Sequence, residues 1–132
     1  MWGEMKDIKE KWPQYFATRA EGGIGFECGP GWHQTIRELL AFIEVHLPEA
    51  DFKIVQIKEK FGYLTIYTQY YDEQIDKLVR RACHNASEIC EFCGATEGVE
   101  RKSWANWVKT LCQECGPKYR DGWRPWVEEY NG

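Results

Sequence analysis

The sequence predicts an α+β protein, with helices packed on a β-hairpin or small antiparallel sheet and a C-terminal four-cysteine zinc module. Two observations predict this class. Residues 1–89 show helix-like and strand-like patterns in the order helix, helix, strand, strand, helix. Two CxxC pairs then follow with the spacing C-x2-C-x18-C-x2-C. We therefore expect an α+β domain over 1–89 and a zinc-binding module with an aromatic C-terminal tail over 90–132.

Residues 4–18, 31–47 and 72–88 have the apolar spacing of amphipathic helices. Pro13 should end the first helix at the preceding residue, with a further turn after it. Asp72 suits the N-cap of the third helix, because its carboxylate can accept hydrogen bonds from the first turn.

Residues 52–58 and 63–69 are rich in β-branched and aromatic side chains and predict two strands. Residues 59–62 supply the turn between them, and Gly62 can adopt the positive φ that such a turn needs. A two-stranded hairpin is marginal in water, so helices or further strands must cover at least one of its faces.

Residues 20–31 contain five glycines and one proline, which predicts a loop with unusual backbone angles. The loop leads into a helix, so its amides could bind an anion at the helix N-terminus. A tight packing turn is the preferred alternative, because the spacing matches neither a P-loop nor a dinucleotide fingerprint. The candidate site residues of this segment are Phe26, Glu27, Cys28 and Trp32.

The two CxxC pairs predict one structural Zn²⁺ ion held by Cys90, Cys93, Cys112 and Cys115. Each CxxC turn directs two sulfurs at one centre, and four thiolates close a tetrahedral site. A closed site leaves no coordination position for water or substrate, so the metal would stabilise the fold rather than catalyse a reaction. Iron has the same ligand count, and a redox CxxC pair is a further alternative.

Inside the module, residues 99–103 and 106–111 read as short strands, and residues 113–121 as the start of a helix. The order knuckle, hairpin and helix resembles the treble clef of GATA-like fingers. A zinc ribbon is the alternative, because Gly116 and Pro117 weaken the helix. The GATA-like fingers that read DNA are strongly basic, whereas residues 90–132 carry six basic and seven acidic side chains. The scaffold alone therefore does not give a function.

Aromatic and basic side chains are interleaved in the module and after it. This candidate binding surface comprises Arg101, Lys102, Trp104, Trp107, Lys109, Arg120, Trp123, Arg124 and Trp126. Such side chains can cover the zinc site, contact a protein, or stack on nucleotides, and we rank these roles in that order. The net charge of −4 argues against a general nucleic-acid binder but leaves room for a local basic strip.

The sequence offers little for catalysis. Cys28 and His33 could form a nucleophile and a base, but no third orienting residue is identifiable, and a buried structural cysteine is the commoner case. Cys83 is expected in the core. We therefore expect a protein without enzymatic activity, with a metal-dependent enzyme as the last alternative. The chain shows no membrane-spanning apolar run and no signal peptide, so we expect a cytoplasmic protein.

Three stretches together resemble a set of small phage and prophage proteins. They are GFECGPGW at 25–32, VQIKEKFGYL at 55–64, and the double CxxC with KTLC at 109–112. The resemblance covers about residues 25–116 and implies a context rather than a chemistry. Small phage proteins of this kind often act by binding, including as inhibitors of host defence. The resemblance therefore implies a protein partner in a bacterial host cytoplasm, with nucleic acid as the alternative.

Overall fold

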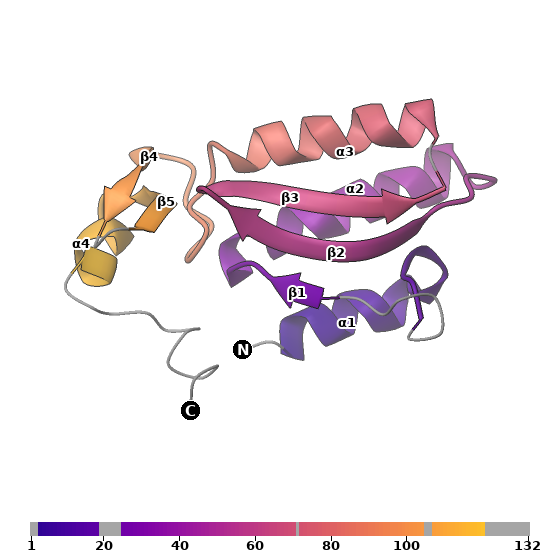
Figure 1. Cartoon of the computed structure of the whole chain (residues 1–132), viewed down its shortest axis with the longest axis horizontal. Helices are drawn as coiled ribbons and strands as arrows, with labels where there is room; N and C mark the ends of the chain where they lie inside the picture. Colours follow the sequence, from indigo (N-terminus) through magenta and orange to yellow (C-terminus); the bar gives the residue numbers. More distant parts are fainter. Residues whose placement is uncertain (1–2, 19–24, 71, 105–106, 121–132) are drawn as a thin grey trace.

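The computed structural model describes residues 3–18, 25–70, 72–104 and 107–120; the side chains of residues 3–5, 25–26, 104, 107 and 120 lie outside that description. It confirms the α+β class (Figure 1). In chain order the elements, with η for a 3-10 helix, are α1 (Gly3–Lys11), η1 (Pro13–Tyr15), β1 (Gly25–Glu27), η3 (Pro30–Trp32), α2 (His33–His46), β2 (Lys53–Lys60), β3 (Tyr63–Gln69), α3 (Glu73–Ala86), β4 (Val99–Trp104), β5 (Trp107–Cys112) and α4 (Cys115–Arg120).

The larger sheet has three strands in the order β1-β2-β3. The antiparallel pair β2–β3 is the predicted hairpin, with a two-residue turn at Phe61 and Gly62. Both turn residues have positive φ, 53° and 84°, which matches the right-handed twist of the flanking strands. The expectation of a loop throughout 20–31 is wrong at Gly25–Glu27, since these residues form β1, which pairs in parallel with β2. A three-residue strand next to glycines has no periodicity to reveal it.

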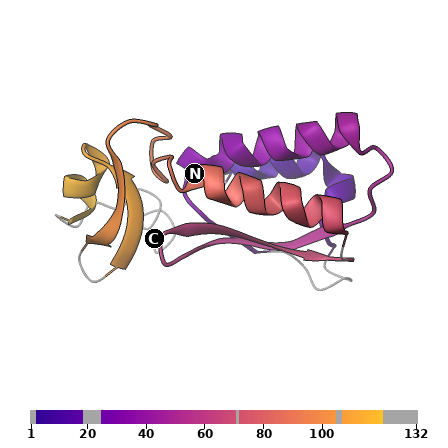
Figure 2. The ribbon, with the colours of Figure 1, turned by 90° about the horizontal axis from the view of Figure 1, so that it is seen from above.

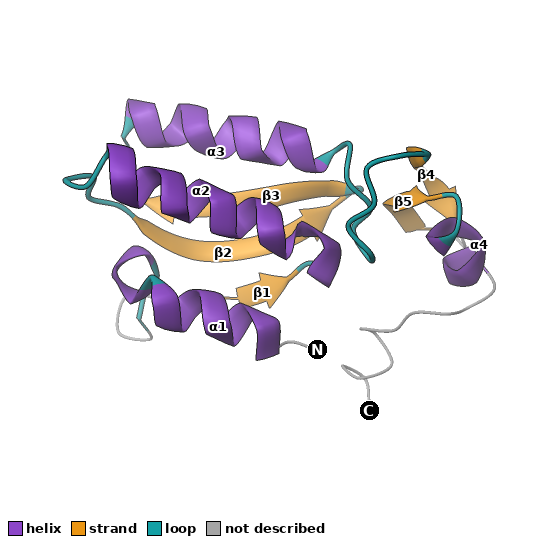
Figure 3. Ribbon diagram, turned by 180° about the vertical axis from the view of Figure 1, so that it is seen from behind, coloured by secondary structure: helices purple, strands orange, loops and turns teal. Residues whose placement is uncertain are grey.

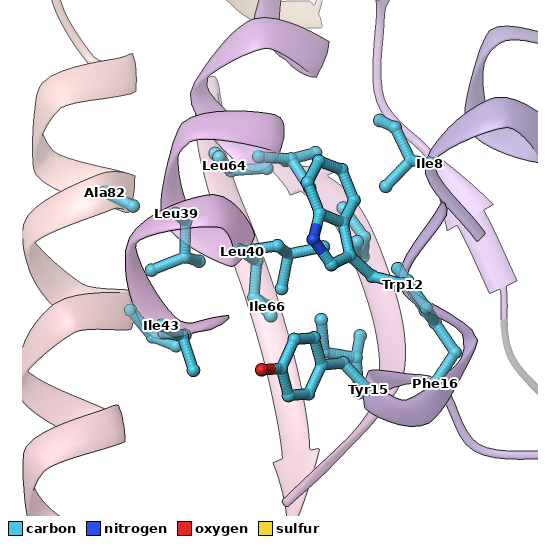
Figure 4. Packing of buried hydrophobic residues seen from close by; sticks show 14 of the residues in the cluster. Ile8, Trp12, Tyr15, Phe16, Leu39, Leu40, Ile43, Leu64, Ile66 and Ala82 are labelled. Carbon is cyan, nitrogen blue, oxygen red and sulfur yellow. The ribbon is translucent and has the colours of Figure 1, made fainter. Parts of the chain in front are cut away.

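Three helices, α1, α2 and α3, cover one face of this sheet (Figures 2 and 3). Figure 4 shows the core between the layers, where side chains from α1, α2 and α3 meet Leu64 and Ile66 of β3. Trp32, Ile36 and Ile57 are fully buried in the same cluster. The apolar stripes predicted for the helices therefore face the sheet.

The N-terminal segment packs as an arm across this core. The helix α1 ends at Lys11 and η1 follows at Pro13, as the proline predicts. Tyr15 stacks on Phe52 at 4.9 Å between ring centroids. The amide of Ala17 donates to the carbonyl of Ile54 at 2.9 Å, which joins the arm to the edge of β2.

The last helix of the layer, α3, begins at the predicted cap. The Asp72 carboxylate accepts hydrogen bonds from the amides of Gln74 and Ile75 at 2.8 and 3.1 Å. Beyond α3 lies a second buried cluster, formed by Cys90, Phe92, Leu111, Cys112, Cys115 and Tyr119. The part of the chain that the structure describes contains no helix that is both long and apolar enough to cross a membrane.

Candidate metal centre

The four cysteines of the two CxxC pairs come together at one point. Their sulfur atoms all lie within 4.8 Å of one another, and the Sγ atoms of Cys93 and Cys112 are 3.7 Å apart. A tetrahedral ion with metal–sulfur bonds of about 2.3 Å requires sulfurs about 3.8 Å apart, so this set fits a zinc-sized ion. Cys90, Cys112 and Cys115 are buried, and Cys93 is exposed.

Local structure explains this convergence. In the first pair, Gly94 turns the chain with φ of 82°, and its amide donates to the carbonyl of Cys90 at 2.9 Å. In the second pair, Cys112 ends β5 and Cys115 begins α4, and the amide of Cys115 donates to the Cys112 sulfur at 3.4 Å. The module thus has the order knuckle, hairpin and helix.

The surroundings of the sulfurs shift the pKa values of the cysteines in opposite directions. Burial raises the pKa of Cys90, and burial together with the neighbouring Cys90 raises that of Cys115. Burial also acts on Cys112, but hydrogen bonds from the amides of Cys115 and Glu114 outweigh it and bring the Cys112 pKa to about 7. A divalent ion compensates the mutual repulsion of four thiolates and holds all of them deprotonated.

The module docks on the rest of the chain through Gly31. A Cβ atom at this position would lie 2.1 Å from the carbonyl oxygen of Cys90 and 2.6 Å from the amide nitrogen of Gly94. The amide of Gly31 donates to the carbonyl of Glu91 at 2.7 Å. Only a residue without a side chain permits this contact, so η3 lies directly against the first CxxC turn.

Three charged side chains form a cluster next to the first CxxC pair, where Glu91 directly follows Cys90. The Lys109 ammonium is 2.7 Å from Glu59 Oε1 and 3.4 Å from Glu91 Oε1. Glu91 is fully buried, and its burial raises its pKa to about 7, against the opposing effect of Lys109. Burial lowers the pKa of Lys109, but the two carboxylates outweigh this effect and raise it, so the ammonium stays charged.

Glu91 also binds the backbone of the glycine-rich segment before α2. Its second carboxylate oxygen accepts a hydrogen bond from the amide of Gly29 at 3.0 Å. The Gly29 amide, considered from the sequence as an anion site, thus binds a carboxylate of the same chain. Gly29 itself has an ordinary φ of −73°. The segment is a packing turn at Gly29 and Gly31.

The hairpin turn of β2–β3 forms the other side of this interface. The Thr110 hydroxyl donates to the Gly62 carbonyl at 2.6 Å, and Arg101 Nε donates to the Phe61 carbonyl at 2.8 Å. The Gly62 amide donates to Glu59 Oε2 at 2.7 Å. Glu59 therefore connects the turn to Lys109, and the four-cysteine module contacts both η3 and the hairpin.

The structure changes the role of several predicted surface residues. Placing Lys109 on an exposed binding surface is wrong, because its side chain is 8% exposed and paired with two carboxylates. Arg101 lies over the ring of Tyr63 at 4.4 Å, and Lys102 is exposed, 3.5 Å from Glu100. The other residues of the predicted surface lie outside the described part of the chain. This applies to the side chains of Trp104, Trp107 and Arg120 and to the whole of Trp123, Arg124 and Trp126.

The predicted loop site is also largely inaccessible. Trp32 is fully buried and donates from Nε1 to the carbonyl of Ile89 at 2.8 Å. Cys28 is 1% exposed, and its burial, with Glu91 nearby, raises its pKa well above the usual value. The thiol is therefore a poor nucleophile in this state. Glu27 is exposed, and the Phe26 side chain lies outside the described residues.

A groove between α2 and α3 was not predicted from the sequence. It encloses a cavity of about 220 Å³ with an apolar floor that includes Leu39 and Ala82. Glu38 and Phe42 line it from α2, and Arg81 from α3. Phe42 is 47% exposed, whereas the apolar side chains of α2 that face the sheet are buried. The available sequence signal was the position of this aromatic residue, which lies off the apolar stripe of its helix.

Comparison with known proteins gives no relative: no family model matches the chain, and neither does any curated protein or solved structure.

Proposed function

We propose that this protein is a non-enzymatic binding protein of phage type, stabilised by one structural Zn²⁺ ion, whose partner is another protein. The resemblance to phage proteins suggests a host factor, including a defence factor, in the bacterial cytoplasm. The order of knuckle, hairpin and helix supports a treble clef rather than a ribbon. Four cysteine ligands fill a tetrahedral zinc ion, which supports a structural role.

The groove between α2 and α3 is the observation that carries the proposal of a protein partner. Its volume of about 220 Å³ accommodates one large apolar side chain. Glu38 and Arg81 on opposite walls give it a polar rim of both signs, and Phe42 offers an exposed aromatic ring. An apolar pocket with a polar rim is typical of the energetic centre of protein interfaces.

The test is to introduce the same charge inside and outside the groove. The variant Phe42→Glu places a carboxylate in the groove wall, whereas Val45→Glu places one on the same helix at a side chain that is 70% exposed. Proteins captured from a bacterial lysate are identified for each variant and for the wild type. A partner retained by Val45→Glu and lost by Phe42→Glu supports the proposal. Capture that is identical for the two variants contradicts it.

A further inference from the structure

The larger sheet has a second face that no described helix covers. Since α1, α2 and α3 lie on one side, the other side of β2 and β3 faces the viewer in Figure 1. Tyr63 and Tyr67 on β3 project there and are 46% and 39% exposed. Of the three side chains between them, Leu64 and Ile66 point into the core and Thr65 lies on the open face, as strand alternation requires.

The register of the hairpin places cations beside both rings. Lys60 is opposite Tyr63, and Lys58 is opposite Thr65, midway between the two tyrosines. The Lys58 ammonium is 5.7 Å from the centre of the Tyr67 ring. From the zinc module, the Arg101 guanidinium lies 4.4 Å from the centre of the Tyr63 ring.

This face differs in charge from the rest of the chain. Lys58, Lys60 and Arg101 bring three positive charges to it, against the carboxylate of Glu27, which pairs in register with Lys58. The whole chain, by contrast, has a net charge of −4. The surface around the two exposed rings is therefore positively charged, although the protein as a whole is acidic.

We propose that this open face, centred on Tyr63 and Tyr67, binds single-stranded nucleic acid. Exposed rings on a flat sheet offer stacking platforms for unpaired bases, and the adjacent cations meet the phosphates. A duplex stacks its bases inside the helix and offers no free base face to the two rings, so it should not bind. The site differs from the groove between α2 and α3, and it can therefore fail or succeed independently of the protein partner.

The experiment measures fluorescence anisotropy of labelled oligodeoxyuridylate and oligouridylate, which differ only in the 2′-hydroxyl and are each about 12 nucleotides long, with the zinc-loaded full chain. We expect both to bind at low salt and a matched duplex not to bind. With three cations, the slope of log affinity against log salt should be no steeper than about −2. Equal binding of the two oligomers would assign the site to either nucleic acid, and a preference would show whether the 2′-hydroxyl contributes.

Variants of Tyr67 separate stacking from other effects. Tyr67→Leu keeps an apolar side chain and removes the ring, and it should weaken binding about 5- to 100-fold. Tyr67→Phe keeps the ring and should bind within about twofold of the wild type. Lys58→Gln should reduce the salt slope by about 0.7. Val45→Ala removes an apolar side chain that is 70% exposed on the helical layer and is the control expected to have no effect.

Three results would overturn the proposal. The first is no binding of either oligomer at low salt by protein with full zinc content. The second is binding that Tyr67→Leu and Val45→Ala leave equally intact. The third is binding of an acidic peptide, polyglutamate, with the same dependence on Tyr67 and Lys58 and no binding of oligonucleotides, which would assign the face to an acidic protein segment.

Discussion

Replacing Gly31 with alanine should destabilise the whole protein, because the added methyl group has no room where η3 meets the first CxxC turn. The new Cβ atom would lie 2.1 Å from the oxygen of Cys90 and 2.6 Å from the nitrogen of Gly94. Both neighbours are backbone atoms of the metal-binding turn, so no side chain can rotate away. The two backbones would have to separate by roughly an ångström.

The size of the effect follows from what this separation breaks. Overpacking of this kind costs about 1–3 kcal/mol. The shift also lengthens the hydrogen bonds from Gly31 to the Glu91 carbonyl and from Gly29 to the Glu91 carboxylate. A bond to a charged group contributes about 1.5–3 kcal/mol. We expect a total loss of about 3–5 kcal/mol in the free energy of unfolding, or about 10–20 °C in Tm for a chain of this size.

The assay is thermal unfolding followed by circular dichroism, together with the rate of metal transfer to a chromophoric chelator. The control is Pro30→Ala, which alters the neighbouring residue without adding atoms at the contact and should cost less than about 1 kcal/mol. Metal transfer from Gly31→Ala should be faster, because the clash lies at the turn that holds Cys90 and Cys93. A Tm for Gly31→Ala within 2–3 °C of the Pro30→Ala value would refute the reasoning.

Removing the metal with a chelator should release one zinc ion per chain and lower the Tm by more than about 10 °C, as metal analysis and calorimetry would show; an unchanged Tm would contradict a structural role. Lys109→Met should cost about 3–5 kcal/mol in denaturant unfolding, because Glu91 and Glu59 lose their cation, and the added change Glu91→Gln should recover part of this loss. Burial raises the pKa of Cys83 to about 11, so its alkylation by iodoacetamide at pH 8 should be about 100-fold slower than that of an ordinary thiol and should rise as the pH approaches 11, as peptide mass spectrometry can measure. A Cys83 rate equal to that of a free thiol at pH 8 would be evidence against this burial.

The elements that carry their own local signal were predictable from the sequence. The third helix shows its apolar spacing and its cap at Asp72 within one segment, and Gly62 marks the hairpin turn. The strand β1 could not be found in this way. Its three residues, Gly25–Glu27, form a strand because β2 is available beside them, and that partner lies about 30 residues away.

The four cysteines could be predicted from the sequence, whereas the ion pairs of the neighbouring Lys109 could not. Each CxxC pair is a local turn, so its spacing alone indicates a metal. The position of Lys109 depends on Glu59, which is 50 residues away along the chain. One signal was nevertheless present, since Lys109 shares a strand face with Leu111 and alternation would direct both side chains inward.

The polar contacts between the two parts imply that they fold as one cooperative unit. Among the residues that the structure describes, the second cluster has six buried members, too few to support an independent domain without a bound metal. If the parts separated, Glu91 would lose the Gly29 amide, and Glu59 would lose the cation of Lys109. A buried carboxylate stripped of its partners is costly, so opening the interface and releasing the metal should coincide. Metal binding at the four cysteines would thereby stabilise the packing of η3 and of the β2–β3 turn across the interface.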